Sequence, residues 1–398
     1  MRLLLTGIGG LYNYGCEAIV RGTHRVIRHF IPDADIVYAS PRHESDQKTI
    51  ADLDISVVRR EIPKRFSPSN IMRKLQGMAG IKKFSQFDSQ RSIENIDAVF
   101  SIGGDIYTLQ NRRGDYNGSI VQYTDYCLSK GKKLILWGAS VGPFSSHPDI
   151  EKLIINQLKR FHAITLREDA SFDYLNSFGL NNIHRCADPA FLVEPGLIKT
   201  STTTNNLIGI NLSPLSALTL NRHMAEVLML QSQTISKMID RFHVDVLLIP
   251  HVVCPEMSND DDLGYLLKLA QMVNKPQHVS VLQNAHDFIE TKRHLVDCDL
   301  VIAARMHCAI NAMTARVPTL LLSYSAKAKG MCRKVYDVDD YCFPIDFCSS
   351  SEHQNGFLET VEAILSHKEG IYGILNKSIP VMQEKAEFPI GEFTIRQK

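Results

Sequence analysis

The stretch that decides the fold is Asp299-Leu-Val-Ile-Ala-Ala-Arg305-Met-His307-Cys-Ala-Ile-Asn311. Residues 300–304 form a short apolar run of the kind that fills a buried parallel strand. Residues 307–316 then follow a helical spacing, and Pro318 ends this helix before a second apolar run over 319–323. A strand, a helix and a strand in so few residues predict one βαβ step of an α/β sheet.

Two polar residues, Arg305 and His307, stand at the carboxyl end of the first strand, where open α/β sheets bind their ligands. Because they are two residues apart, an extended backbone would point both side chains to the same side. A guanidinium beside an imidazole suits an anionic substrate that must also exchange a proton. The plainer alternative is that Arg305 pairs with a carboxylate and that His307 is a hydrogen-bonded residue at a helix start.

The composition of the 398-residue chain indicates two or three domains with sizeable cores, since 44% of the residues are hydrophobic. A formal net charge of +1 gives no overall attraction to nucleic acid. The nine cysteines include no Cys-x-x-Cys pair, which favours single thiols in a reducing cytoplasm over a structural zinc site. The chain starts with a short strand and a glycine turn, and no apolar run reaches about 20 residues. We therefore expect a cytoplasmic protein without a signal peptide or a membrane helix.

A glycine loop follows the first predicted strand, residues 3–6, and enters a helix with the sequence Gly7-Ile-Gly-Gly-Leu-Tyr-Asn13-Tyr-Gly15-Cys-Glu17. Such loops bring backbone N–H groups and a helix N-terminus to a ligand. The sequence argues against a dinucleotide site, because Tyr12 replaces the last glycine of the fingerprint and Pro41-Arg42 follows the second strand in place of an acid. Glu17 either favours the helix dipole or presents its carboxylate to a ligand, and both interpretations stay open.

Three further predicted strands end in polar or glycine-rich loops. Paired glycines let a ligand approach the backbone, and several such loops at strand carboxyl ends predict the rim of one cleft. The loops are Gly103-Gly104-Asp105 after residues 98–102, Gly138-Ala-Ser140-Val-Gly142-Pro143 after residues 133–137, and Arg167-Glu168-Asp169 after residues 163–166.

The segment between Arg59 and Arg91 differs in composition from the rest of the chain. It holds nine Lys or Arg residues against two acids, Glu61 and Asp88, and apolar side chains are interleaved with these charges. One interpretation is a solvated insertion. The sharper one is a basic amphipathic patch that contacts an anionic lipid or a phosphorylated acceptor, which would place the protein peripherally at the inner face of the membrane.

The domain organisation follows from a Thr-, Ser- and Asn-rich piece over residues 199–206, which is the best linker. It separates an α/β domain over residues 1–198, expected to be Rossmann-like and to hold the acceptor, from a second one over residues 207–375 that carries the Arg-x-His motif. A polar tail over residues 376–398 follows.

A set of motifs occurs in order along the chain: Asn13-x-Gly15-x-Glu17-Ala18, Gly103-Gly104-Asp105, Gly138-Ala-Ser140-Val-Gly142-Pro143, Leu166-Arg167-Glu168-Asp169-Ala-Ser171, Asp188-Pro189-Ala-Phe191, Ala304-Arg305-Met-His307, Pro318 and Tyr324-x-x-Lys327-x-x-Gly330. From about residue 1 to about residue 335 this set resembles the polysaccharide pyruvyl transferase family. The sequence departs from the family at Cys16, where the family often has Asp, and in the basic segment, which does not align.

The resemblance implies a glycosyltransferase-B-like fold, with a cleft between two Rossmann-like domains. It also implies transfer of the pyruvyl group of phosphoenolpyruvate onto two hydroxyls of one sugar, which forms a cyclic ketal. The acceptor would be an exopolysaccharide, a capsule or cell-wall glycan, or its lipid-linked precursor. Within the family, the Arg and His of the Arg-x-His motif are the proposed pyruvate-binding and acid–base residues, which correspond to Arg305 and His307. An earlier motif arginine corresponds to Arg167.

We therefore assign catalysis to Arg305 and His307. Phosphoenolpyruvate carries a carboxylate and a phosphate, so we expect Arg305 and Arg167 to clamp its two ends from the two domains. The chemistry needs no redox cofactor, and no metal-ligand spacing is present, so we expect a reaction without a cofactor. The residues assigned to substrate binding are Arg167, Asp105, Gly103, Gly104, Asn13, Glu17, Ser140 and Lys327.

Two other functions stay open at this point. A sugar-nucleotide-dependent glycosyltransferase would use the same fold, with Arg305 and His307 on a nucleotide diphosphate. A glycan-binding subunit without catalytic activity would need neither residue, and the presence of both beside Arg167 argues against it.

Overall fold

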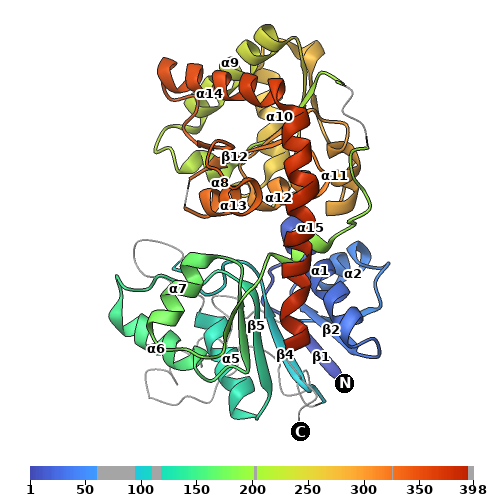
Figure 1. Ribbon diagram of the computed structural model, residues 1–398, viewed down its shortest axis with the longest axis vertical. Coiled ribbons are helices and arrows are strands. Elements are labelled where there is room, and N and C mark those ends of the chain that lie inside the picture. Colours follow the sequence, from blue (N-terminus) through green and yellow to red (C-terminus); the bar gives the residue numbers. More distant parts are fainter. Residues whose placement is uncertain (61–94, 110–117, 201–203, 325, 393–398) are drawn as a thin grey trace. The chain divides into compact units, whose positions relative to one another are not determined.

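The structure, a computed structural model, describes residues 1–60, 95–109, 118–200, 204–324 and 326–392 (Figure 1). The basic segment 59–91 therefore lies outside the described residues, apart from Arg59 and Arg60. Within the described part of the chain, every helix is too short or too polar to cross a lipid bilayer.

The first of two sheets has seven parallel strands in the order β3-β2-β1-β4-β5-β6-β7. The central strand β4 is buried along its whole length, as its continuous apolar run predicts. The chain reverses its direction of winding between β1 and β4, which is the position where doubly wound sheets bind ligands. The strands are β1 Arg2–Thr6, β2 Asp35–Ser40, β3 Ile55–Arg59, β4 Ala98–Ile102, β5 Lys133–Ala139, β6 Ala163–Leu166 and β7 Ile183–Arg185.

Helices connect β1 to β2, β2 to β3, β4 to β5, β5 to β6 and β6 to β7. Their termini follow the expected chemistry: α6, for instance, starts at Pro148 and carries Asp149 and Glu151 in its first turn. The helices are α1 Tyr14–Phe30, α2 His43–Thr49, α5 Gly118–Ser129, α6 Pro148–Leu158 and α7 Asp169–Ser177, with a short 3₁₀ helix at Pro189–Leu192.

The second sheet has six parallel strands in the order β10-β9-β8-β11-β12-β13. The predicted βαβ step is present, since residues 300–303 form a fully buried strand beside residues 319–323. The winding reverses between β8 and β11, which puts Arg305 at the ligand-binding position of this sheet. The strands are β8 Leu207–Asn211, β9 Asp245–Leu248, β10 Val279–Val281, β11 Leu300–Ala303, β12 Thr319–Ser323 and β13 Cys342–Pro344.

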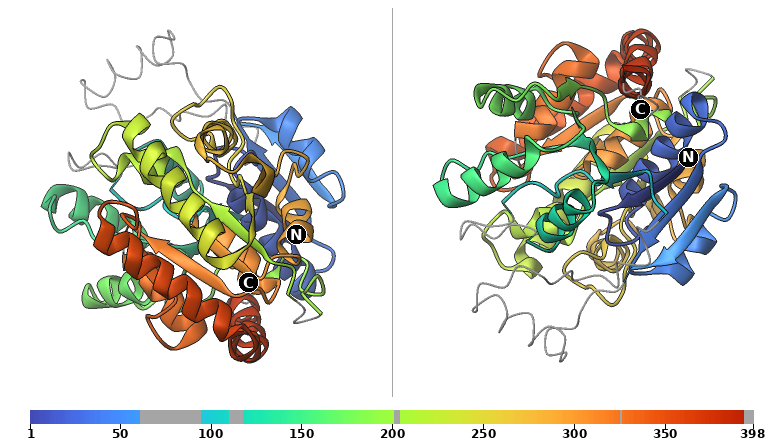
Figure 2. Two further views of the ribbon diagram at one scale, coloured as in Figure 1. Left: turned by 90° about the horizontal axis from the view of Figure 1, so that it is seen from above. Right: turned by 90° about the horizontal axis from the view of Figure 1, so that it is seen from below.

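The helices of this part include two that lie side by side at its outer surface, α9 and α14 (Figure 2). Arg241 of α9 forms an ion pair with Glu362 of α14, and Lys237 donates a hydrogen bond to Gln354. The helices are α8 Pro214–Leu218, α9 Met224–Phe242, α10 Asp262–Met272, α11 Phe288–Leu295, α12 Met306–Thr314, α13 Ala326–Tyr336, α14 Ser351–Ser366 and α15 Lys368–Glu392, with a 3₁₀ turn at Pro276–His278.

The chain forms two compact units, and the sequence-based domain boundaries differ from them in detail. The first unit comprises Met1–Leu11, Ile19–Pro189 and Lys385–Lys398. The second unit comprises Tyr12–Ala18 and Ala190–Glu384. The expected polar tail over 376–398 is the last part of helix α15 up to residue 392. Each unit is a parallel α/β sheet with connecting helices, so the predicted class of two Rossmann-like domains is confirmed.

Candidate active site

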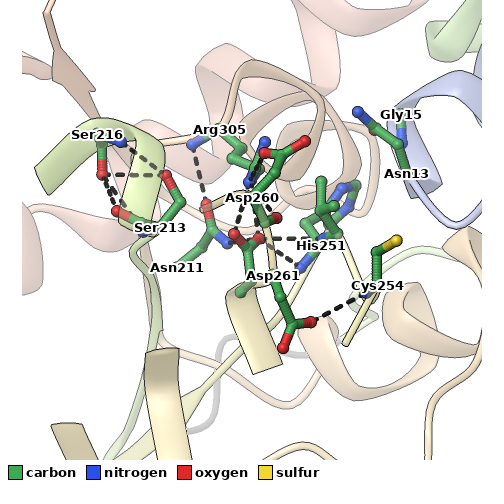
Figure 3. A network of polar contacts seen from close by, with 12 residues as sticks. Asn13, Gly15, Asn211, Ser213, Ser216, His251, Cys254, Asp260, Asp261 and Arg305 are labelled. Carbon is green, nitrogen blue, oxygen red and sulfur yellow. Dashed lines mark hydrogen bonds and ion pairs between the residues drawn. The ribbon is translucent and has the colours of Figure 1, made fainter. Parts of the chain in front are cut away.

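The centre of the candidate site in the second unit is Arg305, the residue that precedes helix α12. Its backbone N–H donates to Oδ1 of Asn211 at the end of β8, 2.9 Å away, which fixes the turn between strand and helix (Figure 3). Its Nε lies 2.8 and 2.9 Å from the two carboxylate oxygens of Asp262. Its Nη2 donates to Oδ1 of Asp262 and to Oδ1 of Asp260, both at 2.7 Å. Two carboxylates thus hold the guanidinium in one orientation.

This arrangement keeps Arg305 charged and leaves one of its nitrogens available. Only 14% of the side chain is exposed, and Asp262 is fully buried. Burial opposes the charge of Arg305, but the carboxylates of Asp262 and Asp260 outweigh it and raise the pKa of the guanidinium above that of an ordinary arginine. Within the described part of the chain, no acceptor lies within hydrogen-bonding distance of Nη1 of Arg305. The plainer sequence interpretation, an arginine paired with a carboxylate, is correct for Nε and Nη2 and leaves Nη1 for a ligand.

His307 stands in the first turn of α12, partly exposed, with the glycine loop of the N-terminus against it. A Cβ added to Gly15 would lie 2.3 Å from Nδ1 and 2.7 Å from the Cβ of His307. Only glycine therefore fits at position 15 while the imidazole keeps its place. The glycine loop and the Arg-x-His motif are almost 300 residues apart in sequence and lie in contact in the second unit.

The glycine loop is held in the second unit by backbone pairing. Asn13 and Val252 form an antiparallel bridge, and the N–H of Tyr14 donates to the carbonyl of His251 at 3.0 Å. Oδ1 of Asn13 accepts from the N–H of Gly15 at 3.0 Å, which caps the first turn of α1. The side chain assigned to substrate binding at position 13 thus shapes the loop that contacts His307.

The expectation that Glu17 presents its carboxylate to a ligand needs correction. Glu17 has no exposed surface, and its Oε2 accepts a hydrogen bond of 2.8 Å from the backbone N–H of Phe288, the first residue of α11. A carboxylate at that position satisfies an N–H group that the helix itself cannot pair. Glu17 therefore fastens the glycine loop to α11 and does not face a substrate in this structure.

Sequence reasoning missed His251, which follows β9. Its side chain is fully buried between the rings of Tyr14 and Phe288, with centroids 5.7 and 5.5 Å away. Among the described residues, neither ring nitrogen has a hydrogen-bond partner. Burial, together with the positive charges of His307 and Arg305, lowers its pKa well below the ordinary value, so His251 is neutral. A buried imidazole with both nitrogens unpaired is costly and points to a functional role.

The acids that hold Arg305 were also missed, for a different reason. The run Asp260-Asp261-Asp262 at the start of a predicted helix resembles ordinary helix capping. Asp261 does cap α10, because its Oδ2 accepts from the N–H of Gly264 at 2.9 Å. Its Oδ1 accepts from the N–H of Cys254, also at 2.9 Å (Figure 3). Its neighbours Asp260 and Asp262 instead turn to Arg305. The signal available in the sequence was that three consecutive acids exceed what one helix terminus needs.

The first unit has a second arginine cluster, centred on Arg167 after β6. Nη1 of Arg167 forms an ion pair with the fully buried Asp188. Nη2 lies 3.5 Å from Oδ1 of Asp105, and Nε lies 3.2 Å from Oγ of Ser140. Ser140 in turn donates to Glu168 at 2.7 Å. Burial opposes the charge of Arg167, yet Asp188, Asp105 and Glu168 together raise its pKa.

The glycines assigned to the site lie beside this cluster. A Cβ at Gly104 would come within 2.2 Å of Nη2 of Arg167, so the glycine makes room for the guanidinium. Gly103 has a φ of +128°, in the region that favours glycine. Lys327 lies in the first turn of α13, in the second unit. The structure thus brings Arg167, Asp105, Gly104 and Ser140 together in one unit, and Arg305, His307, Asn13 and Gly15 in the other.

The expected clamp of phosphoenolpyruvate by Arg305 and Arg167 stays a prediction, and the contacts that each guanidinium makes within its own unit bear on it. Every nitrogen of the Arg167 guanidinium is engaged by a residue of its own unit, and the side chain is only 7% exposed. Arg305 keeps only Nη1 for a ligand. In the described ranges, no group of three or more His, Cys, Asp or Glu side chains is arranged to hold a metal ion.

Solved structures with the same architecture place the fold in a class. HepE of Anabaena, solved with UDP and glucose, is 13% identical with a TM-score of 0.58 over 98% of this chain and 99% of HepE. The UDP-GlcNAc 2-epimerase of Neisseria meningitidis, bound to UDP-GlcNAc, is 10% identical with a TM-score of 0.61 over 100% of both chains. At such identities the likeness concerns the fold, which is that of the two-domain, glycosyltransferase-B-like proteins.

The sequence profile described as "Polysaccharide pyruvyl transferase" matches residues 13–326, which is most of the chain. The protein therefore belongs to the polysaccharide pyruvyl transferase family and is a transferase, as the ordered motifs predicted. The matched range starts at Asn13 and includes Arg167, Arg305 and His307, whereas Lys327 lies just beyond it.

Proposed function

We propose that this protein transfers the pyruvyl group of phosphoenolpyruvate onto two hydroxyls of one sugar and forms a cyclic ketal. The acceptor is a sugar of an exopolysaccharide, a capsule or a cell-wall glycan, or of its lipid-linked precursor. The proposal is carried by one observation: Arg305 and His307 lie together at the ligand-binding end of β11. The orientation of the Arg305 guanidinium is fixed, and its Nη1 is available to a ligand.

The chemistry needs a cation and a proton carrier at one place. Nη1 of Arg305 would bind an anionic group of phosphoenolpyruvate, and the carboxylates behind it would keep the guanidinium from turning away. His307 would donate a proton to the methylene carbon, which makes the adjacent carbon electrophilic. One sugar hydroxyl then adds to that carbon and releases its proton. The carbon–oxygen bond to phosphate breaks, and the second hydroxyl adds with loss of its own proton to close the ketal.

The first unit would present the acceptor in this proposal. Asp105 is the suitable residue, because its side chain is 59% exposed while one oxygen is anchored by Arg167. A carboxylate held in this way can accept a hydrogen bond from a sugar hydroxyl. Arg167 and Ser140 would then act as supports for Asp105. We place the reaction in the cytoplasm, with contact to the inner membrane face where the acceptor is lipid-linked.

The test is phosphate release from phosphoenolpyruvate across a panel of free and lipid-linked saccharides, with the product examined by mass spectrometry. The expected product is the acceptor carrying one pyruvyl ketal, formed in step with phosphate. The reaction should be unaffected by a chelator, because phosphoenolpyruvate supplies both the electrophilic carbon and the leaving group. Release of phosphate without a modified saccharide would contradict the proposal.

A sugar-nucleotide-dependent glycosyltransferase is the second candidate, favoured by one observation. HepE, which shares the fold, was solved with UDP and with UDP-glucose. Thermal shifts distinguish the two functions: phosphoenolpyruvate should raise the melting temperature of this protein, and UDP-sugars should not. The opposite pattern would favour the glycosyltransferase.

A further inference from the structure

A basic groove lies in the first unit at the carboxyl ends of β2 and β3, the two strands at one edge of the sheet. Ser40, the last residue of β2, pairs in register with Arg59, the last residue of β3. The loop after β2 and the helix α2 complete the hollow, which has a volume of about 430 Å³. The residues that line this groove include Pro41, Arg42, His43, Glu44, Lys48 and Arg59.

The groove carries an excess of positive charge. Arg42, Lys48 and Arg59 are basic, and Glu44 is the single carboxylate among the lining residues. Within the described residues, neither Lys48 nor Arg59 forms an ion pair with a carboxylate. Cations gathered around one hollow repel each other, and a bound anion relieves that repulsion.

The carboxylate of Asp46 does not line the groove. Asp46, the second acid of α2, faces the interior and is 1% exposed. Its carboxylate accepts hydrogen bonds from the hydroxyls of Ser40 and Tyr38 and from the backbone N–H of Leu11. Asp46 thus anchors α2 to the sheet and does not line the groove, where Lys48 lies one helical turn after Glu44.

The groove lies on the same edge of the sheet as the Asp105 loop. Both stand at carboxyl ends of parallel strands, with β1 between β2 and β4. Since neighbouring strands are about 4.8 Å apart, β2 and β4 are separated by about 10 Å along this edge. A ligand with a sugar at Asp105 could place a group one or two sugar lengths away in the groove.

We propose that the groove binds a phosphate or diphosphate group carried by the saccharide acceptor. This inference rests on the proposed function for the sugar, and on the geometry of the groove for the anion. Arg59 offers a guanidinium fork, which suits phosphate oxygens, and Lys48 adds a point charge. The phosphate distinguishes an activated, carrier-linked acceptor from a finished, neutral polymer.

The direct test is calorimetric binding of inorganic diphosphate to the full-length protein. The groove variant carries Arg42→Gln, Lys48→Gln and Arg59→Gln. The control carries Lys130→Gln, Lys152→Gln and Lys159→Gln, three exposed lysines of the same unit with the same loss of charge. We expect the groove variant to bind diphosphate at least about tenfold more weakly, and the control to match the wild type. Equal binding in all three proteins, or none in the wild type, would overturn the proposal.

Two further arms identify the source of the phosphate and separate this inference from the proposed function. With a diphosphate-linked saccharide, the groove variant should show a raised KM and an unchanged kcat, and the same saccharide without phosphate should be used equally by both proteins. Binding to phosphatidylglycerol vesicles should be the same in both proteins. A loss of vesicle binding with unchanged diphosphate binding would overturn the proposal in favour of a membrane contact. Absence of turnover with every acceptor would contradict the proposed function, while diphosphate binding would still test the groove.

Discussion

The two arginine clusters of this protein are built alike and differ in what they leave available. Arg167 and Arg305 each follow a buried strand of their own sheet and precede a helix. Each is gripped by two aspartates of its own unit. Each cluster also has a glycine whose missing side chain makes room for a neighbour, Gly104 for Arg167 and Gly15 for His307.

The difference lies in the completeness of the hydrogen bonding. The guanidinium of Arg167 is bonded at all three nitrogens, so this arginine joins β6, the Asp105 loop and Asp188. Arg305 keeps one nitrogen for a ligand, and His307 and the unpaired His251 lie close to it. The same local sequence, an arginine at a strand end, therefore produces a cross-link in one unit and the proposed reactive site in the other.

The largest effect is expected at the reactive site. His307→Ala should lower kcat by about 10²–10⁴, which is the usual contribution of one acid–base group, and leave phosphoenolpyruvate binding largely intact. Steady-state phosphate release and calorimetric binding measure the two quantities. His307→Gln, which forms hydrogen bonds but cannot titrate near neutrality, serves as the matched variant and should be nearly as slow. A kcat equal to wild type in either variant would remove His307 from the mechanism.

A substitution in the Arg167 cluster should instead lower the free energy of unfolding. Arg167→Met leaves Asp188 buried without its partner, so we expect the first unit to lose about 3–5 kcal/mol of unfolding free energy in urea. The double variant Arg167→Met/Asp188→Asn should recover much of that loss, because no uncompensated charge remains. If Arg167→Met were normally stable but had a raised KM for phosphoenolpyruvate, the expected clamp would be restored and the comparison would fail.

Substitutions at the two glycines test the same comparison, and their expected effects are smaller. Gly15→Ala meets the Cβ of His307, which is fixed to its helix, so the ring must move and activity should fall by about tenfold or more. Gly104→Ala meets the far end of the Arg167 side chain, so about 1–3 kcal/mol of stability should be lost instead.

Gly370→Ala is the control for both glycine variants, because a Cβ there meets nothing within 4 Å and the residue lies in helix α15. It should be neutral or stabilising by less than about 1 kcal/mol. Kinetics and urea unfolding of all three variants make the comparison. Equal activity losses at positions 15 and 104 would mean that both clusters act in the reaction in the same way.

The smallest effect is expected at His251. His251→Phe replaces two unpaired buried nitrogens by carbon, so stability should rise by about 1 kcal/mol while activity falls. The ordinary pKa of 6.5 is lowered in the folded state, so the unfolded state binds the proton more readily below about pH 6.5. Wild type should therefore lose stability as the pH falls through that range, and His251→Phe should lose less. Unchanged activity in the variant would separate His251 from the site, and His251→Leu repeats the test with a smaller side chain.

The sequence predicted those features that depend on neighbours in the chain. The strand over residues 300–303 and the helix after Arg305 follow from local apolar spacing, and the paired glycines marked strand ends correctly. Arg167 was expected to hold one end of phosphoenolpyruvate, and its ion pairs with Asp105 and Asp188 were not foreseen. Such choices depend on which loops a sheet brings together.

Burial was equally hard to predict where it depends on distant segments. Glu17 has the spacing of a residue that faces a ligand, yet it pairs with a backbone group 271 residues further along the chain. His251 ends an ordinary strand and gives no local sign of its environment. The membership of residues 12–18 in the second unit follows from bridges to residues 251–253, which no periodicity records.

That membership has a consequence for how the protein is made. Residues 12–18 emerge from the ribosome first, about 170 residues ahead of the unit that they complete. His307 can therefore acquire its glycine neighbour only after α12 has been synthesised, when residues 12–18 dock onto residues 251–253 and α12. A fragment over residues 190–384 would lack the carboxylate that accepts from the N–H of Phe288 and the glycine that lies against His307. Assembly of the candidate site thus requires the chain from residue 12 to the end of α12.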